Sequence, residues 1–311
     1  MKLYEYWALQ YRDNPYLDHL EDKHLLQRAR DIFANITTLS NDSKIGVVQV
    51  DKEGKDWWIL WTHILMEMRT RFGPYPKKMW KEFAKEVHFP DPRDEISRKA
   101  AKFISENSIN EKGCLYKYGK KKYLDDFLNS GTLRLSPASY YSDPSLNLSI
   151  RDDELRVKIY PNPHTFGFES NKIIIKNANY KSGPHLKNIT INTDTDYYVF
   201  CMSKVLLPRL FYDFKVDSVL IIKNPSVFIE KLNSSFKNIT KDFLTVVSKV
   251  KYYDPILINS PELNPFISKH FRYAYEKEER FLCIPKNRTK TLSFLNLSLG
   301  DLNEIAEIFT I

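Results

Sequence analysis

Glycine and cysteine are scarce in this chain, and each scarcity argues against a class of protein. Only 9 of the 311 residues are glycine, and neither G-x-G-x-x-G nor G-x-x-x-x-G-K-[ST] occurs, so Rossmann and P-loop nucleotide sites find no support. The three cysteines, Cys114, Cys201 and Cys283, lie far apart. Such a set predicts neither a disulfide framework nor a zinc site and favours a reducing cytosol. The seven histidines are scattered without an H-E-x-x-H motif, so we expect no metal site.

Long apolar runs are also missing. The first 16 residues, MKLYEYWALQYRDNPY, lack the apolar core of a signal peptide. The most apolar run, WWILWTHILMEM at 57–68, is too short and too polar to cross a bilayer. We therefore expect a cytoplasmic protein that makes no use of a membrane.

Positive charge is present in excess, but only in one part of the chain. Lys and Arg number 47 against 39 Asp and Glu, a net charge of +8. Residues 1–111 hold 18 basic and 18 acidic side chains, whereas residues 112–311 hold 29 and 21. A basic part joined to a neutral part suggests a polyanionic ligand, such as nucleic acid, a nucleotide or an anionic surface. Solubility alone explains an excess of this size equally well.

The residues up to about 110 predict an N-terminal helical domain, because apolar residues recur there at helical spacing. The tryptophan-rich stripe at 57–65 is more typical of a helix-bundle core than of a partner-docking face. The expected helices are 18–36, 56–73, 76–89 and 92–107.

From residue 111 onward the sequence predicts an α+β domain, 111–311, built on antiparallel sheets. Short strand patterns alternate irregularly with a few helical patterns, without the regular spacing of β–α–β units. The helix at 121–130 should end at Gly131. The expected strands are 114–118, 132–136, 154–160, 171–177, 196–203, 216–222, 245–254, 273–285 and 291–297, and the other short helices are 224–235 and 262–271.

The segment FRYAYEKEERFLCIP at 271–285 has the aromatic and branched content of a strand but carries an acidic pair in its middle. Residues i and i+2 of a strand face the same way, so Glu276, Glu278 and Arg280 should share a face. Two carboxylates about 7 Å apart repel each other and lose hydration when covered. Taken alone, the segment favours a solvated edge strand in which Glu278 merely pairs with Arg280.

Five segments, taken in order, change that interpretation. Together they resemble a large bacterial family of uncharacterised domains related to the ADP-ribosyltransferases. The resemblance covers roughly residues 113–290 and leaves out the helical N-terminal part. It implies an ADP-ribosyltransferase-like core with a split antiparallel sheet. The segments are LYKY (115–118), SGTLRLSPASYYSDP (130–144), YYVFCMS (197–203), VKYYD (250–254) and KHFRYAYEKEER (269–280).

The resemblance also implies an activity, the transfer of ADP-ribose from NAD. In ADP-ribosyltransferases an E-x-E or Q-x-E on a late strand lines the NAD cleft. Glu278 would hold a ribose hydroxyl and stabilise the oxocarbenium-like charge that develops as nicotinamide leaves. Glu276 would orient or deprotonate the acceptor.

Other residues acquire NAD-binding roles by the same resemblance, and the pattern departs from the best-known transferases at two of them. The opening strand has Lys117 where those enzymes have Arg or His, and Ser203 stands near the place of a Ser-Thr-Ser motif that is otherwise absent. Tyr140 or Tyr141 would form the platform for nicotinamide. The rim residues that would meet the adenosine ribose or pyrophosphate are Tyr116, Lys117 and Tyr118.

Three consecutive lysines, Lys120, Lys121 and Lys122, are flanked by tyrosines. This pattern suits contact with a nucleic acid, although the solvated first turn of a helix would look the same.

The activity that the resemblance implies is that of an NAD-dependent mono-ADP-ribosyltransferase. Family members of this kind act as intracellular toxins or anti-phage effectors, so an inhibitor or antitoxin protein is the expected partner. RNA, DNA and protein stay open as acceptors, with RNA weakly favoured. The alternatives are a non-catalytic module that binds nucleic acid or a partner, and an NAD glycohydrolase.

Overall fold

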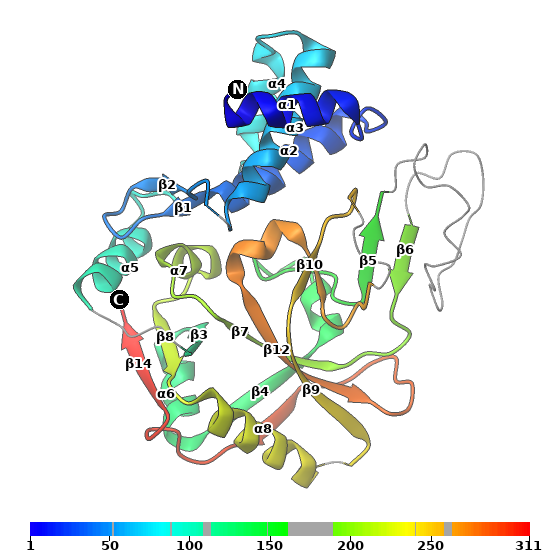
Figure 1. The fold of residues 1–311 in the computed structure, drawn as a ribbon. Helices are drawn as coiled ribbons and strands as arrows, with labels where there is room; N and C mark the ends of the chain where they lie inside the picture. The colour runs from blue at the N-terminus through cyan, green and yellow to red at the C-terminus, as the bar shows by residue number, and fades with distance from the viewer. Residues whose placement is uncertain are drawn as a thin grey trace.

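The structure is a computed structural model that describes residues 1–51, 53–87, 89–107, 113–147, 149–160, 189–239, 241–257 and 263–311. Its elements form a helical cap and a body built around a sheet (Figure 1). The cap contains α1 (Leu3–Asp13), α2 (Asp22–Ile36), α3 (Lys55–Phe72), α4 (Lys77–Lys85) and the hairpin of β1 (Thr37–Leu39) and β2 (Ile45–Val47). The helices of the body are α5 (Glu95–Glu106), α6 (Lys121–Ser130), α7 (Pro208–Phe214), α8 (Pro225–Ile239) and the 3-10 helices η1 (Ala138–Ser142) and η2 (Phe271–Glu276). Its strands are β3 (Leu115–Gly119), β4 (Thr132–Pro137), β5 (Arg156–Ile159), β6 (Ile189–Asn192), β7 (Tyr198–Ser203), β8 (Ser218–Ile222), β9 (Phe243–Lys249), β10 (Lys251–Tyr253), β11 (Ser268–His270), β12 (Glu278–Pro285), β13 (Leu295–Ser298) and β14 (Ala306–Thr310).

The cap is held by the apolar face of α2. Leu25, Ala29 and Ile32 lie one helical turn apart and are fully buried against Ile64 and Met68 of α3. The four helices expected from the sequence correspond to α2, α3, α4 and α5. Helix α1 and the β1–β2 hairpin were not predicted.

Eight strands of the body form one antiparallel sheet, which splits along one edge of β7. On the other edge β7 pairs with β12 over its whole length, and β12 pairs in turn with β9. At the split, Ser203 of β7 pairs with β3, whereas residues 198–199 pair with β4. From there β3 leads to β8 and β14, and β4 leads to β13. The prediction of an α+β body with antiparallel sheets is confirmed.

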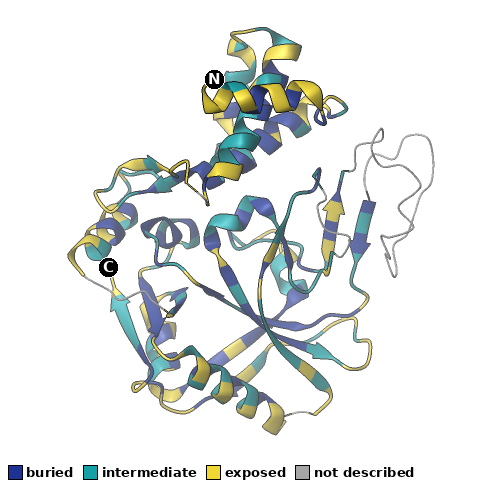
Figure 2. Cartoon of the chain, in the orientation of Figure 1, coloured by how far each residue is buried: buried dark blue, intermediate teal, exposed yellow. Residues whose placement is uncertain are grey.

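The middle of this sheet is buried, whereas the outward faces of α1 and α8 are exposed (Figure 2). Helix α5 packs against α7 of the body, with Ala100 buried beside Leu210 and Phe211. It does so although it precedes the boundary expected near residue 110. Independent folding of 1–110 and 111–311 stays a prediction.

Two predicted elements are wrong, and in both the local pattern was overridden. The segment 262–271 was expected to be helical, but Ser268–His270 form β11, which pairs in parallel with β10. The expected strand 273–285 begins only at Glu278, because Phe271–Glu276 form η2. Lys277 connects them in the left-handed conformation, with φ 43°. The expected strand 171–177 lies outside the described residues.

A buried ion pair fastens the cap to the body. Both terminal nitrogens of Arg28 on α2 donate to the two carboxylate oxygens of Asp254, at 2.7 and 2.6 Å. Two parallel hydrogen bonds of this kind fix the relative orientation of the two side chains as well as the distance between them. Asn35 of α2 donates to the Phe271 carbonyl at 3.0 Å and accepts from the Tyr275 N–H at 3.0 Å, so α2 also fixes η2.

Gly131 ends α6 as predicted, and its geometry yields a stability test. Its φ is +65°, and a Cβ atom there would lie 2.3 Å from the Gly300 carbonyl oxygen. Because that oxygen belongs to backbone, Gly131→Ala should lower the free energy of unfolding by about 2 kcal/mol or more. Urea unfolding of the purified protein would measure the change.

The matched control is Gly300→Ala, because Gly300 has φ +70° but nothing within 4 Å of its added Cβ. Its free energy of unfolding should fall by only about 1 kcal/mol, the cost of placing a residue other than glycine in the left-handed conformation. Equal losses in the two variants would show that the contact between the backbone at 131 and at 300 is not tight.

Candidate functional site

The two acidic residues expected on one strand lie instead on either side of a turn. Glu276 ends η2 and Glu278 begins β12, with Lys277 between them. Because β12 lies between β7 and β9, it is a central strand and not the edge strand that its charges suggested. Glu276 and Glu278 are only 4% and 5% exposed. The solvated-surface interpretation is therefore wrong.

Lys269 of β11 brings the two carboxylates together. Its ammonium donates to Glu276 Oε2 and to Glu278 Oε2, each at 2.8 Å. The side chain of Lys269 is 9% exposed, so this double ion pair is shielded from water. The parallel pairing of β11 with β10 places Lys269 next to the start of β12.

Arg280 extends this contact to a third carboxylate. Its Nε donates to Glu278 Oε1 at 2.7 Å, and its two terminal nitrogens lie 2.7 Å from the two oxygens of Glu154. Arg280 has no exposed surface. We call Glu276, Lys269, Glu278, Arg280 and Glu154 the buried ionic network.

The network holds three carboxylates and two cations, and the balance between burial and these cations sets the direction of each pKa shift. Burial raises the pKa of Glu276 to about 7, with Lys269 opposing the shift, and burial likewise raises that of Glu154 to about 7. Burial would also raise the pKa of Glu278, but Arg280 and Lys269 together outweigh it, so its pKa is lowered. Glu278 is thus the carboxylate that stays charged at neutral pH.

A cavity of about 180 Å³ opens beside the network, at the split of the sheet. Its walls come from β3, β7, β11, the start of β12, η1, the end of η2, the segment before β5, and α7 with the residues after it. Seven residues that the sequence proposed as site residues line it: Tyr116, Lys117, Tyr118, Tyr141, Ser203, Glu276 and Glu278.

The residues of β3 and β7 in this wall are held by hydrogen bonds. Lys117 donates from Nζ to the Cys201 carbonyl at 2.9 Å, and burial lowers its pKa. The Tyr118 hydroxyl donates to the Val205 carbonyl at 3.1 Å. Ser203 donates to the main-chain carbonyl of Glu276 at 2.7 Å, so it positions the turn that carries the acidic pair.

One carboxylate oxygen in the wall is without a partner among the described residues. Glu276 Oε1 is buried, and no described residue makes a hydrogen bond to it. Glu276 lines the cavity, so this unpaired oxygen belongs to a residue of the cavity wall. The neighbouring Cys201 is not an activated nucleophile, because burial, and then Glu278, raise the pKa of its thiol well above the ordinary value.

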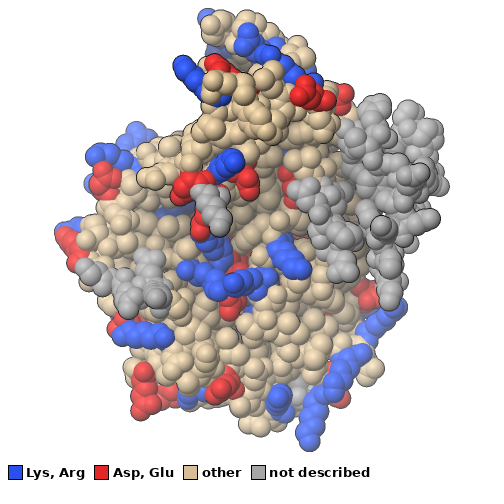
Figure 3. Space-filling model, viewed as in Figure 1, with Lys and Arg blue, Asp and Glu red and all other residues tan. Residues whose placement is uncertain are grey.

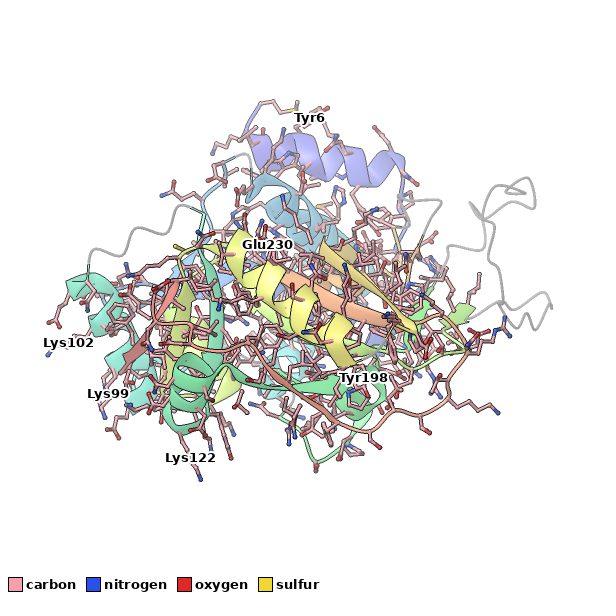
Figure 4. The ribbon with its side chains drawn as sticks, turned by 90° about the horizontal axis from the view of Figure 1, so that it is seen from below. Tyr6, Lys99, Lys102, Lys122, Tyr198 and Glu230 are labelled. Carbon is pink, nitrogen blue, oxygen red and sulfur yellow. The ribbon has the colours of Figure 1, made fainter. Side chains whose placement is uncertain are left out.

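Four predicted site residues lie elsewhere. Tyr140 faces a separate hollow, with its ring 5.1 Å from that of Phe294, so only Tyr141 of the tyrosine pair reaches the cavity. Lys120, Lys121 and Lys122 are exposed at the start of α6 and do not line the cavity. Figure 4 shows Lys122 pointing away from the molecule.

Sequence reasoning missed Lys269 and Glu154 and gave Arg280 too small a role. The Lys of the closing segment KHFRYAYEKEER was a signal for Lys269, but it had no assigned partner. Glu154 had no local signal, because it meets Arg280 from 126 residues away.

Comparison of the chain with protein-family models, with curated proteins and with solved structures gave no match. Among the described residues there is no group of His, Cys, Asp and Glu that could hold a metal ion. Within the same residues, no helix has the length and apolar character needed to span a bilayer.

The cavity wall holds one carboxylate that stays charged, Glu278, and two carboxyls with a pKa of about 7, Glu276 and Glu154. Lys269 and Arg280 keep Glu278 ionised, so its carboxylate can face a positive charge that develops in a ligand. Glu276, with a pKa of about 7, can take up or release a proton near neutral pH.

The raised pKa of Glu276 predicts a pH dependence of stability. Its pKa rises from 4.5 to about 7 on folding. Between these values the folded protein binds more protons at Glu276 than the unfolded chain does, so the free energy of unfolding should fall as the pH rises through this window. In Glu276→Gln, which carries no titratable proton there, the fall measured by urea unfolding should be shallower than in the parent protein.

Glu279→Gln is the control, since Glu279 points to the other face of β12 and pairs with Lys204 at 2.8 Å. The free energy of unfolding of this variant should fall with pH as steeply as that of the parent protein. If Glu276→Gln also keeps the parent slope, Glu276 does not take up a proton on folding.

Proposed function

We propose that this chain is an NAD-dependent mono-ADP-ribosyltransferase with its active centre at the cavity beside the buried ionic network. One observation carries the proposal. Glu278 is held ionised in the cavity wall by Lys269 and Arg280, next to a second carboxyl, Glu276, that has an unpaired oxygen. The split of the sheet at this point agrees with the ADP-ribosyltransferase-like fold that the resemblance implies.

The cavity fits one end of NAD and not the whole dinucleotide. Its volume of about 180 Å³ is below the roughly 300–1,000 Å³ of pockets that enclose a drug-sized ligand. It can take the nicotinamide ring and part of the adjoining ribose, with Tyr141 as the aromatic wall. The rest of NAD would then lie outside the cavity.

In the proposed reaction, Glu278 acts on charge and Glu276 acts on a proton. The bond between the ribose C1′ and the nicotinamide nitrogen breaks, and its electron pair leaves with nicotinamide. Glu278 stabilises the positive charge left on the ribose. An acceptor oxygen or nitrogen forms the new bond to C1′, and its proton passes to Glu276.

The ion pairs of Glu278 leave room for a ribose hydroxyl. An ionised carboxylate has about four acceptor positions. Lys269 and Arg280 use one on each oxygen of Glu278, and the Cys201 thiol uses a third, which leaves about one. A hydroxyl donor can therefore bind without displacing either cation.

The biological setting stays a proposal that rests on the resemblance. A free transferase would modify its own host, so we propose an intracellular toxin or anti-phage effector held in check by an inhibitor protein. Nucleic acid, with RNA favoured, is the proposed acceptor because residues 112–311 carry the whole positive excess. On the face in Figure 3, however, basic and acidic side chains are interspersed and form no continuous basic stripe.

A second candidate is a non-catalytic module that binds nucleic acid or a partner on the same fold. The small cavity and the Lys at position 117 favour it. The charge state of the Glu276–Glu278 pair favours an enzyme, either the transferase or an NAD glycohydrolase that uses water as acceptor.

Substitution of the acidic pair tests the catalytic proposal. Glu278→Gln should reduce cleavage of NAD about a hundredfold or more, because it removes the charge that faces the developing cation. Glu276→Gln should impair transfer to the acceptor more than hydrolysis of NAD. Release of labelled nicotinamide measures cleavage, and label retained on macromolecules measures transfer.

One control separates chemistry from folding. Glu278→Gln leaves buried cations undercompensated and should also destabilise the fold, by roughly 3 kcal/mol. Asp254→Asn should be destabilised similarly, because it breaks the buried pair with Arg28, yet keep its activity at temperatures where it is folded. Full activity in folded Glu278→Gln would show that Glu278 does not stabilise the developing cation, in a transferase or in a glycohydrolase.

The salt dependence of RNA binding tests the proposed acceptor. The slope of log K against log salt is about −0.7 for each phosphate contact with a single strand. Replacing Lys120, Lys121 and Lys122 by Ala should therefore make the slope less steep by about 2, as measured by fluorescence anisotropy of a labelled single-stranded RNA.

Replacing Lys99 and Lys102 by Ala is the control, since both are exposed on α5 and lie outside the basic run 120–122 (Figure 4). This control should leave the slope nearly unchanged. No affinity for RNA at low salt would exclude RNA as the acceptor and favour a protein.

A further inference from the structure

The helical cap contains a groove that the proposed active centre does not use. It has a volume of about 870 Å³ and runs between α1 and α3, with the start of α4 at one side. Its floor is aromatic, with Trp58 and Trp61 of α3 and Trp80 of α4. This volume lies in the upper part of the range of roughly 300–1,000 Å³ for ligand-binding pockets.

The walls of the groove expose apolar side chains to water. Leu9 of α1 is 42% exposed, and Leu65 of α3 is 38% exposed. Val50 and Tyr4 are about half exposed at its edges. A contiguous apolar surface of this kind is typical of a place where another molecule packs.

Hydrogen bonds hold α1 and the turn after it on α3. Tyr11 of α1 donates a buried hydrogen bond to Glu67 of α3, and the Tyr16 hydroxyl lies 3.1 Å from Nδ1 of His63. Arg71 bonds to Glu67 and to the Leu17 carbonyl, the latter at 2.7 Å. Because α1 is fixed on α3, little ordering of the groove would oppose binding.

The rim of the groove is positively charged. Arg12 of α1 and Arg69 of α3 both line it, both are exposed, and neither has an ion pair with any described residue. Glu5 also lines the groove, but its carboxylate accepts from the Lys2 N–H at 2.8 Å, at the start of α1. Two unpaired guanidinium groups therefore face whatever occupies the apolar floor.

We infer that this groove binds an amphipathic helix of a partner protein, with an apolar face for the tryptophan floor and acidic side chains for Arg12 and Arg69. Apolar residues at positions i, i+3, i+4 and i+7 of such a helix lie on one face, as in other helix-in-groove complexes. The acidic flanks bond to the two guanidinium groups and determine orientation. A second copy of this chain fits less well, because it is itself positively charged.

A peptide library with open charge choice tests this inference independently of NAD chemistry. Displayed 18-residue helical peptides carry random aliphatic or aromatic residues at i, i+3, i+4 and i+7, and Glu, Lys, Gln or Ala elsewhere. They are sorted on the full-length protein, and Kd values of enriched peptides are measured by fluorescence anisotropy. We expect enrichment of Glu at the flanking positions and a Kd that weakens with salt.

Variants locate the binding site. Leu65→Glu should weaken binding at least about tenfold, because it puts a charge on the apolar wall. Arg12→Glu and Arg69→Glu should each weaken binding about fivefold and improve binding of the matching Lys-flanked peptides. Leu244→Glu is the control, since Leu244 is 58% exposed on β9 outside the groove, and it should bind as the parent protein does.

Three results would overturn the inference. The first is no enrichment, or enrichment of neutral or Lys-rich peptides. The second is equal binding by Leu65→Glu and the parent protein. The third is self-association in sedimentation that Leu65→Glu abolishes, which would assign the groove to a second copy of the chain. Activity on NAD does not enter any of these readouts, so this test can fail while the transferase proposal stands, and the reverse.

Discussion

Burial of three carboxylates around two cations is the constraint on which the body of this protein depends. Glu278 can lie inside a central strand only because Lys269 and Arg280 neutralise it. These side chains come from β11 and β12, and Glu154 comes from the segment before β5. A buried ion pair of this kind contributes little net stability, but removal of one partner leaves an uncompensated charge. The network therefore restricts how these segments can pack more than it strengthens the fold.

The helical cap has a part in this arrangement. Arg28 holds Asp254, which follows β10, and Asn35 holds the main chain of η2 at both ends. Strand β10 carries β11 and so Lys269, while η2 carries Glu276. The contacts between cap and body thus lie directly behind the residues of the buried ionic network. A partner bound in the groove of the cap would lie on α1, α3 and α4, and both α3 and α4 pack against α2, which makes these contacts.

The different surroundings of the carboxylates also provide the proposed chemistry. Burial raises the pKa of each buried carboxyl, and the two cations outweigh it only at Glu278, which contacts both of them. Here Glu278 holds its charge, and Glu276 is displaced toward a pKa of about 7 by burial. Two neighbouring carboxyl groups with different charge states at the same pH can divide charge stabilisation and proton transfer between them.

The sequence by itself determined most of the local structure and the composition of the cavity wall. Helix α2 followed from apolar spacing, and α6 with its end at Gly131 followed from the demand for a left-handed residue. Tyr116, Lys117, Ser203, Glu276 and Glu278 were proposed together from five short segments, and they do line one cavity. Only the tertiary structure decided whether the acidic pair is exposed or buried.

The expectation that alternate residues of a strand face the same way failed at 271–276, because η2 packs against α2 and the turn at Lys277 redirects the chain. Lys269 and Glu154 were beyond sequence reasoning for a related reason. Their roles depend on the pairing of β11 with β10 and on a contact across 126 residues, and local residue patterns encode neither.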